Sequence, residues 1–192
     1  MRGRVVALLG AESTGKTTLA QALGAALVEA GWRVTVVAEF LREFCIEHGR
    51  TPRQDEQAAI AGEQTRRIEA ARAKNDLVVA DTTALMVAVY SETVFGDTSL
   101  YDSARAAQRG FELTLVTALD LPWHADGHQR TGAHVRPSVD ALLRGALERG
   151  GIAWCEISGA GDARLAAAQR AVAQRFGAGP AATRLGPASR RE

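Results

Sequence analysis

Short apolar runs alternate with longer helical patterns along most of this 192-residue chain. The apolar runs lack regular polar positions, which is typical of strands that helices cover on both faces. The expected strands are residues 4–9, 33–38, 76–80, 111–119 and 152–157. The expected helices are residues 17–30, 40–48, 52–74, 84–95, 99–109, 139–148 and 162–176. This alternation predicts an α/β fold in which helices flank both faces of an open, mostly parallel, five-stranded sheet.

The pattern also predicts how the chain is divided. Residues 1–176 contain no linker and no internal repeat, so we expect a single domain there. Residues 177–192 are Gly, Pro, Ala and Arg without periodicity, which indicates a disordered tail. Pro52 is expected at the first position of its helix, where a proline is well tolerated.

A glycine-rich loop carries the most specific chemical signal. Residues 10–17 match G-x-x-x-x-G-K-[ST] and lie between the first expected strand and the first expected helix. In such loops the backbone N–H groups and the helix N-terminus bind phosphates, the lysine reaches the β- and γ-phosphates, and the threonine hydroxyl ligates Mg²⁺. The expected nucleotide-binding residues are Gly10, Glu12, Ser13, Thr14, Gly15, Lys16, Thr17 and Thr18.

Proteins with such a phosphate-binding loop (P-loop) fall into several classes, and motifs elsewhere in the sequence indicate which class this chain resembles. The sequence has no N-K-x-D tetrapeptide of the kind that reads guanine in GTPases, and no L-S-G-G-Q signature of transporter ATPases. A polar segment at residues 122–137 follows the fourth expected strand, as a lid does in small-molecule kinases. We therefore predict the kinase arrangement, with strand order 2-3-1-4-5 by analogy.

Two carboxylates end strands where a kinase positions its acceptor hydroxyl. Asp81 follows an apolar strand, as an aspartate that holds Mg²⁺ does, and Glu39 follows the second strand. Arg42 has helical spacing to both Glu39 and Glu43 and is expected to pair with one of them. The sequence leaves open which of Glu39 and Asp81 is the general base.

The polar segment supplies further candidates. Arg130, flanked by glycines, is favoured over Arg136 as the arginine that stabilises charge on the transferred phosphoryl group. Tyr90 and Trp123 are candidates for stacking on a flat substrate ring. His124, Asp126 and His128 lack the helical spacing or cysteine partners of a zinc site, so zinc is disfavoured.

Composition excludes several function classes. The net charge of +1 gives no global field for nucleic acid, and two cysteines are too few for a disulfide framework. No apolar run is long enough to span a membrane, and we expect a cytoplasmic protein. Only two of the 23 basic residues are lysines, Lys16 and Lys74, so a lysine at position 16 stands against a strong arginine bias.

Four segments together resemble the ribosylnicotinamide kinase domain of NadR-type proteins. They are GAESTGKTTL in the P-loop, AEFLREF after the second strand, VVADTT after the third and LPWHADG at the start of the polar segment. The resemblance implies transfer of the γ-phosphoryl of ATP to the 5′-hydroxyl of N-ribosylnicotinamide, which makes nicotinamide mononucleotide. It implies ATP and Mg²⁺ at residues 10–18, substrate or catalytic roles for Glu39, Arg42 and Asp81, and lid contacts from Trp123, Asp126 and Arg130. Phe40, next to Glu39, is a further candidate for binding substrate.

The chain departs from this family in two respects. It has no adenylyltransferase or DNA-binding segment, so we expect a kinase alone, with a small-molecule partner and no nucleic acid, whether or not it forms a homo-oligomer. Thr83 stands where an amide or carboxylate is expected, which leaves the acceptor open. A neutral nucleoside would need amide hydrogen bonds of the kind that Gln57 and Gln64 offer. The alternatives are therefore a kinase for another nucleoside or metabolite, and a regulatory P-loop ATPase.

Overall fold

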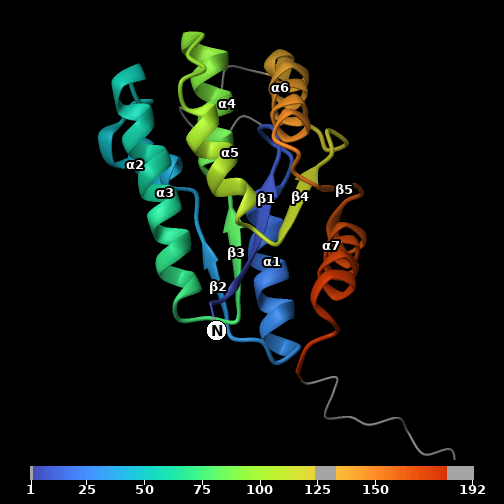
Figure 1. Cartoon of the computed structure of the whole chain (residues 1–192). Helices are drawn as coiled ribbons and strands as arrows, with labels where there is room; N and C mark the ends of the chain where they lie inside the picture. The colour runs from blue at the N-terminus through green and yellow to red at the C-terminus, as the bar shows by residue number, and fades with distance from the viewer. Residues whose placement is uncertain (1, 124–132, 181–192) are drawn as a thin grey trace, which may run out of the picture.

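The computed structural model describes residues 2–123 and 133–180, which form a parallel sheet with helices on both faces (Figure 1). The strand order is β2-β3-β1-β4-β5, and each paired strand runs parallel to its neighbours. The strands are β1 (Arg4–Leu9), β2 (Val34–Val37), β3 (Leu77–Asp81), β4 (Leu113–Thr117) and β5 (Cys155–Ile157). The predicted fold class and strand order are confirmed.

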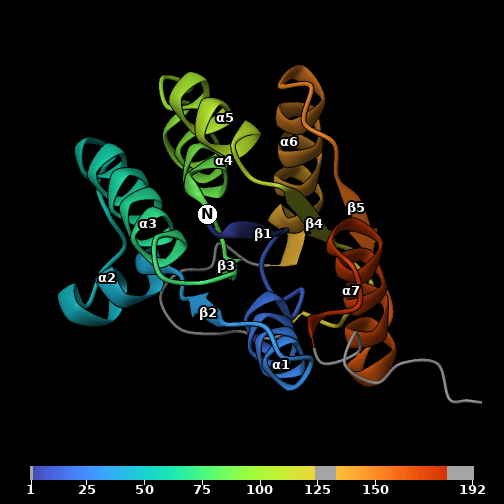
Figure 2. The ribbon, with the colours of Figure 1, turned by 60° about the horizontal axis from the view of Figure 1, so that its bottom comes forward.

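The helices divide between the two faces of the sheet. Helices α1 and α7 pack on one face, and α3, α4, α5 and α6 lie on the other, with α2 beside α3 (Figure 2). Their bounds are α1 (Lys16–Glu29), α2 (Phe40–His48), α3 (Gln57–Arg72), α4 (Ala84–Phe95), α5 (Tyr101–Arg109), α6 (Arg136–Arg149) and α7 (Gly161–Phe176). None of the described helices has both the length and the apolar character that a membrane span requires.

The central strand shows why the sequence lacks polar alternation. In β1, Val6 and Leu8 pack against α1 and α7, whereas Val5 and Leu9 belong to the clusters on the opposite face. All four side chains are fully buried. Because neither face of β1 meets water, the strand is apolar from Val5 to Leu9.

Two helices start three or more residues away from the sequence-based expectation. The helix expected from Pro52 begins as a 3₁₀ turn, η1 (Gln54–Glu56), and continues as α3. The Glu56 carboxylate accepts hydrogen bonds from the Arg53 backbone N–H (2.7 Å) and the Arg50 guanidinium (2.6 Å), so the chain is capped after the proline. The bond from Arg50 is the main reason that the pKa of Glu56 is lowered to about 2. Helix α6 begins at Arg136, three residues before the expected start.

A close approach between α1 and β2 depends on Gly24. A Cβ atom at this position would lie 2.4 Å from Cγ2 of Val36, whereas one at Gly62 in α3 would meet nothing within 4 Å. Both glycines lie inside helices. Since valine is stiff about χ1, α1 or β2 must move to accept a larger residue at position 24.

This contrast predicts opposite effects for the same substitution. We expect Gly62→Ala to raise the free energy of unfolding by about 0.5–1 kcal/mol, because alanine loses less backbone entropy in a helix. We expect Gly24→Ala to lower it by about 1–3 kcal/mol through overpacking. Urea denaturation of the two variants checks this. Equal stabilisation by both would show that the contact between α1 and β2 is loose.

Candidate nucleotide-binding and acceptor site

The P-loop joins β1 to α1 and has a backbone that only particular residues can adopt. Gly10 and Gly15 have φ values of 148° and 74°, and Ser13 has a φ of 51°. A Cβ atom at Gly10 would also lie 2.1 Å from Oγ1 of Thr117 in β4. Glycine at position 10 is therefore required both by the backbone conformation and by the close approach of a neighbouring strand.

A chain of hydrogen bonds holds the loop from the side of the sheet. The Thr117 hydroxyl donates to Oγ1 of Thr14 (2.7 Å), and the Thr14 hydroxyl donates to the Ala11 carbonyl (2.8 Å). The Lys16 ammonium donates to the same carbonyl (2.7 Å). The loop therefore has a defined shape before any phosphate arrives, and its lysine is already folded back over it.

Arg164 supports the loop from α7. Its side chain is buried, and its guanidinium donates to the carbonyls of Thr14 (2.6 Å) and Gly159 (2.6 Å) and pairs with Asp120. Sequence analysis missed this residue. The sequence did contain a sign of its role: Arg164 lies at helical spacing from Ala168 and Val172, the other buried positions of α7, so it falls on the buried face of the helix.

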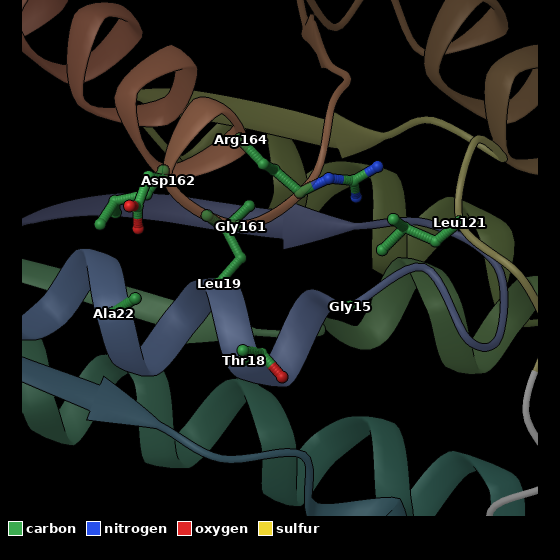
Figure 3. Close-up of a pocket in the computed structure, with 9 residues that line it drawn as sticks. Gly15, Thr18, Leu19, Ala22, Leu121, Gly161, Asp162 and Arg164 are labelled. Atoms are coloured by element: carbon green, nitrogen blue, oxygen red, sulfur yellow. The ribbon is translucent and has the colours of Figure 1, made fainter.

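A cavity of about 290 Å³ opens beside the loop, between the N-terminal ends of α1 and α7 (Figure 3). It starts at Gly15, so a molecule bound there lies next to the P-loop. Its wall is mostly apolar, with Asp162 at one side. The lining residues are Gly15, Thr18, Leu19, Ala22, Leu121, Gly161, Asp162, Arg164 and Leu165. Apart from Gly15 and Thr18, these residues were not predicted as a site.

Asp81 lies at the same edge of the sheet as the P-loop. It ends β3 opposite Leu8 of β1 and is only 2% exposed. Its Oδ1 is buried and has no hydrogen-bond partner. A carboxylate oxygen without a protein partner, at the same edge as the exposed Thr17 hydroxyl, is a donor set that suits Mg²⁺.

The residue after Asp81 has a strained backbone. Thr82 has a φ of 78°, which is unfavourable for a β-branched side chain by about 1–3 kcal/mol. Its N–H donates to the Leu8 carbonyl (3.0 Å), and its own carbonyl accepts from Nε2 of Gln64 (3.2 Å). Bonds from β1 and α3 thus hold the turn that carries Asp81.

Glu39 is the N-cap residue of α2 and lies at the end of β2. Arg42 faces it, with Nε of Arg42 3.8 Å from Oε2 of Glu39. Glu43 instead pairs with Arg67 of α3 (2.6 Å), which also lies over the Phe40 ring at 4.4 Å. Of the two pairings that the sequence allowed for Arg42, the structure has the one with Glu39.

Two polar positions considered for substrate recognition have structural partners instead. The Gln64 amide accepts from the Phe40 N–H (2.8 Å) and donates to the carbonyls of Ala38 and Thr82. It therefore joins the ends of β2 and β3 to α3. The Thr83 hydroxyl caps α4 and donates to Oε1 of Gln108 (2.7 Å). The threonine at this departure from the family pattern has a role inside the fold.

The remaining candidates are placed as follows. Tyr90 and Phe40 are partly buried against the core cluster that contains α4 and α6, and the Nε1 atom of Trp123 is buried without a hydrogen-bond partner. Asp126 and Arg130 lie outside the described residues, as do His124 and His128. Among the described residues, no three His, Cys, Asp or Glu side chains gather as a metal-binding group.

The hydroxyl chain below the P-loop gives a prediction with a control in the same strand. Thr117→Val should lower stability by about 1–2 kcal/mol and also weaken nucleotide binding, because Thr14 loses its donor. Thr114→Val likewise removes a buried hydroxyl of β4, in this case the acceptor of a 2.9 Å hydrogen bond from Nε2 of Gln108. It should lower stability to a similar degree and leave nucleotide affinity unchanged. Denaturation and calorimetric titration with a non-hydrolysable ATP analogue measure both quantities, and equal affinities for the two variants would contradict the coupling.

Solved structures with the same fold include two of NadR. A NadR protein in complex with NR superposes with a TM-score of 0.74 at 22% sequence identity, over 91% of this chain and 51% of that one. NadR in complex with NAD and AMP-PNP superposes with a TM-score of 0.73 at 22% identity, over 91% of this chain and 50% of that one. The present chain therefore spans about half the length of the NadR chains it matches.

At the level of sequence, the chain matches the model of a protein family. A comparison with curated protein sequences finds no significant match. The AAA domain family, in contrast, matches residues 5–164, a stretch that runs from β1 through the first turn of α7 and includes the P-loop, Asp81 and Arg164. Because that match covers well over half of the sequence, the protein belongs to the AAA domain family.

Proposed function

We propose that this protein is an ATP-dependent kinase that phosphorylates the 5′-hydroxyl of N-ribosylnicotinamide. The observation that carries the proposal is the placement of Asp81, a buried carboxylate with an unpartnered oxygen, directly beside the strand that leads into the P-loop. A P-loop supplies the phosphoryl donor, and a carboxylate at this edge meets the acceptor or its metal ion. The fold shared with NadR bound to NR supports this choice of acceptor.

The two ligands would approach the P-loop from different sides. The cavity between α1 and α7 suits the base and ribose of ATP, since it is mostly apolar and begins at Gly15. The acceptor candidates instead come from the ends of β2 and β3 and from α2 and α4. Carboxylates at Glu39 and Asp81 suit a cationic pyridinium ring, and aromatic side chains add a contact of about 0.5–2 kcal/mol.

The strand order favours different roles for the two carboxylates. β3 lies between β1 and β2, so Asp81 is next to the P-loop and Glu39 is one strand further away. We assign Asp81 to the metal side together with Thr17, and Glu39 to the acceptor hydroxyl. When bound there, Mg²⁺ would neutralise charge on the β- and γ-phosphates.

The reaction is a direct transfer. Lys16 would leave the Ala11 carbonyl and bind the phosphate chain. Glu39, oriented by Arg42, would accept the proton of the 5′-hydroxyl while the oxygen of that hydroxyl forms a bond to the γ-phosphorus. The bond between that phosphorus and the β,γ-bridging oxygen breaks, and ADP leaves. Arg130, in the polar segment outside the described residues, is our proposal for stabilising the transferred group.

The proposal is tested by measuring ADP release with and without nicotinamide riboside. We expect clear stimulation and a phosphate ester of the nucleoside by mass spectrometry. Lys16→Ala should abolish turnover while the circular dichroism spectrum is retained. Lys74→Ala is the control, because it removes the other lysine of the chain, which is exposed after α3. Equal ADP release with every nucleoside, and no new ester, would support a regulatory ATPase instead.

The two carboxylates are separated by their response to Mg²⁺. We expect Asp81→Asn to lose activity that excess Mg²⁺ partly restores, and Glu39→Gln to lose about 10²–10⁴-fold in kcat at every Mg²⁺ concentration. Glu43→Gln is the control, since this carboxylate is paired with Arg67 and should leave kcat nearly unchanged. Rescue of Glu39→Gln but not of Asp81→Asn would exchange the two assignments.

A further inference from the structure

Arg136, in the first turn of α6, is a buried arginine that pairs with no carboxylate in the part of the chain that the structure describes. The residue is only 8% exposed, and Nη1 donates to the Leu121 carbonyl at 3.1 Å. Its Nε and Nη2 atoms are buried and have no hydrogen-bond partner. Within residues 2–123 and 133–180, no acidic side chain forms an ion pair with it. Asp140, one turn further along α6, is held instead by Arg144 at 2.6 Å.

Two other arginines are equally buried and show what such a group normally requires. Arg72 is 4% exposed and binds the carbonyls of Gly3 and Gly110 and the Glu112 carboxylate. Arg164 is 3% exposed and has the carbonyl and carboxylate partners described above. A buried guanidinium without an anion is strongly unfavourable. Among residues 2–123 and 133–180, Arg136 therefore lacks the negatively charged partner that Arg72 and Arg164 have.

The position of Arg136 indicates what that partner is. Its acceptor, Leu121, lines the cavity beside the P-loop (Figure 3). The Cδ1 atom of Leu121 lies 3.1 Å from the place that a Cβ atom would occupy at Gly15. Arg136 is thus anchored to the residue that touches the phosphate-binding loop. Its planar guanidinium presents the paired N–H groups that bind phosphate oxygens in a fork.

We propose that Arg136 binds the phosphate chain of the nucleotide held by the P-loop. This rests on nucleotide binding in the proposed function and is independent of the acceptor. The unpartnered Nε and Nη2 atoms are then the binding groups, and the bond from Nη1 to Leu121 sets their orientation. In the ligand-free protein the described residues offer the buried guanidinium no anion to compensate its charge, which is unfavourable. The phosphates of the nucleotide would supply that anion, so part of the binding free energy comes from compensating the charge of Arg136.

This proposal predicts that Arg136→Met maintains or raises the stability of the ligand-free protein but lowers its affinity for nucleotide. The Tm of the ligand-free variant should equal or exceed that of the parent, because a buried charge is replaced by an apolar side chain of similar length. Its affinity for AMP-PNP with Mg²⁺ should fall about tenfold or more, and the rise in Tm on adding AMP-PNP should shrink accordingly. Arg136→Lys should recover part of the lost affinity, because it keeps the charge without the fork.

Arg72→Met is the matched control, since Arg72 is equally buried but has its partners within the fold. It should lower the Tm of the ligand-free protein and leave AMP-PNP affinity unchanged. If Arg136→Met behaves like Arg72→Met, or binds AMP-PNP as the parent does, the proposal is wrong and Arg136 is a structural residue. If the parent itself does not bind AMP-PNP, the proposed function fails first, so the two failures are distinguishable.

Discussion

A parallel sheet buried on both faces restricts where this chain can place charge. The central strands are covered by α1 and α7 on one side and by α3 to α6 on the other, so a carboxylate in the middle of β1, β3 or β4 would lack water and a partner. The carboxyl ends of the strands are the nearest positions where polar groups meet solvent or ligand. The P-loop, Asp81 and Glu39 all begin at such ends, on three neighbouring strands. The concentration of chemistry at one edge is therefore a consequence of burial elsewhere.

The P-loop depends on residues far from it in the sequence. A loop that turns its N–H groups toward a ligand has carbonyl groups that need donors of their own. Arg164 of α7 supplies one for Thr14, and the hydroxyls of Thr117 and Thr14 form a chain that ends on Ala11. The loop is thus clamped by β4 and α7 before a nucleotide binds. Such preorganisation means that binding does not have to order the loop.

Much of the fold could be predicted from sequence, because buried strands and helices require apolar residues at a regular spacing. Helices α2 and α4 have the predicted bounds, and the P-loop motif lies between β1 and α1 as predicted. Predictions of helix starts and side-chain pairings failed where they depended on particular side-chain hydrogen bonds and ion pairs. The bonds from Arg50 and Arg53 to Glu56 delay the start of α3, which no periodicity reveals. The pairing of Arg42 was undecidable, because Arg67, a residue 24 positions beyond Glu43, captures that carboxylate. Sequence likewise could not distinguish Gln64 as a cross-link between elements from Gln64 as a substrate contact.

The division of helices between the two faces separates the two halves of the site. The cavity beside Gly15 is built by α1, α7 and Leu121 in the segment that follows β4, whereas the acceptor candidates belong to α2, α4 and the ends of β2 and β3. Substitutions on distant elements without shared partners act nearly independently. If the proposed kinase function holds, substitutions in α2 and α4 can change the preferred acceptor without disturbing the recognition of the phosphoryl donor. Under the proposed function, one phosphate-binding loop can thus be combined with different acceptor pockets.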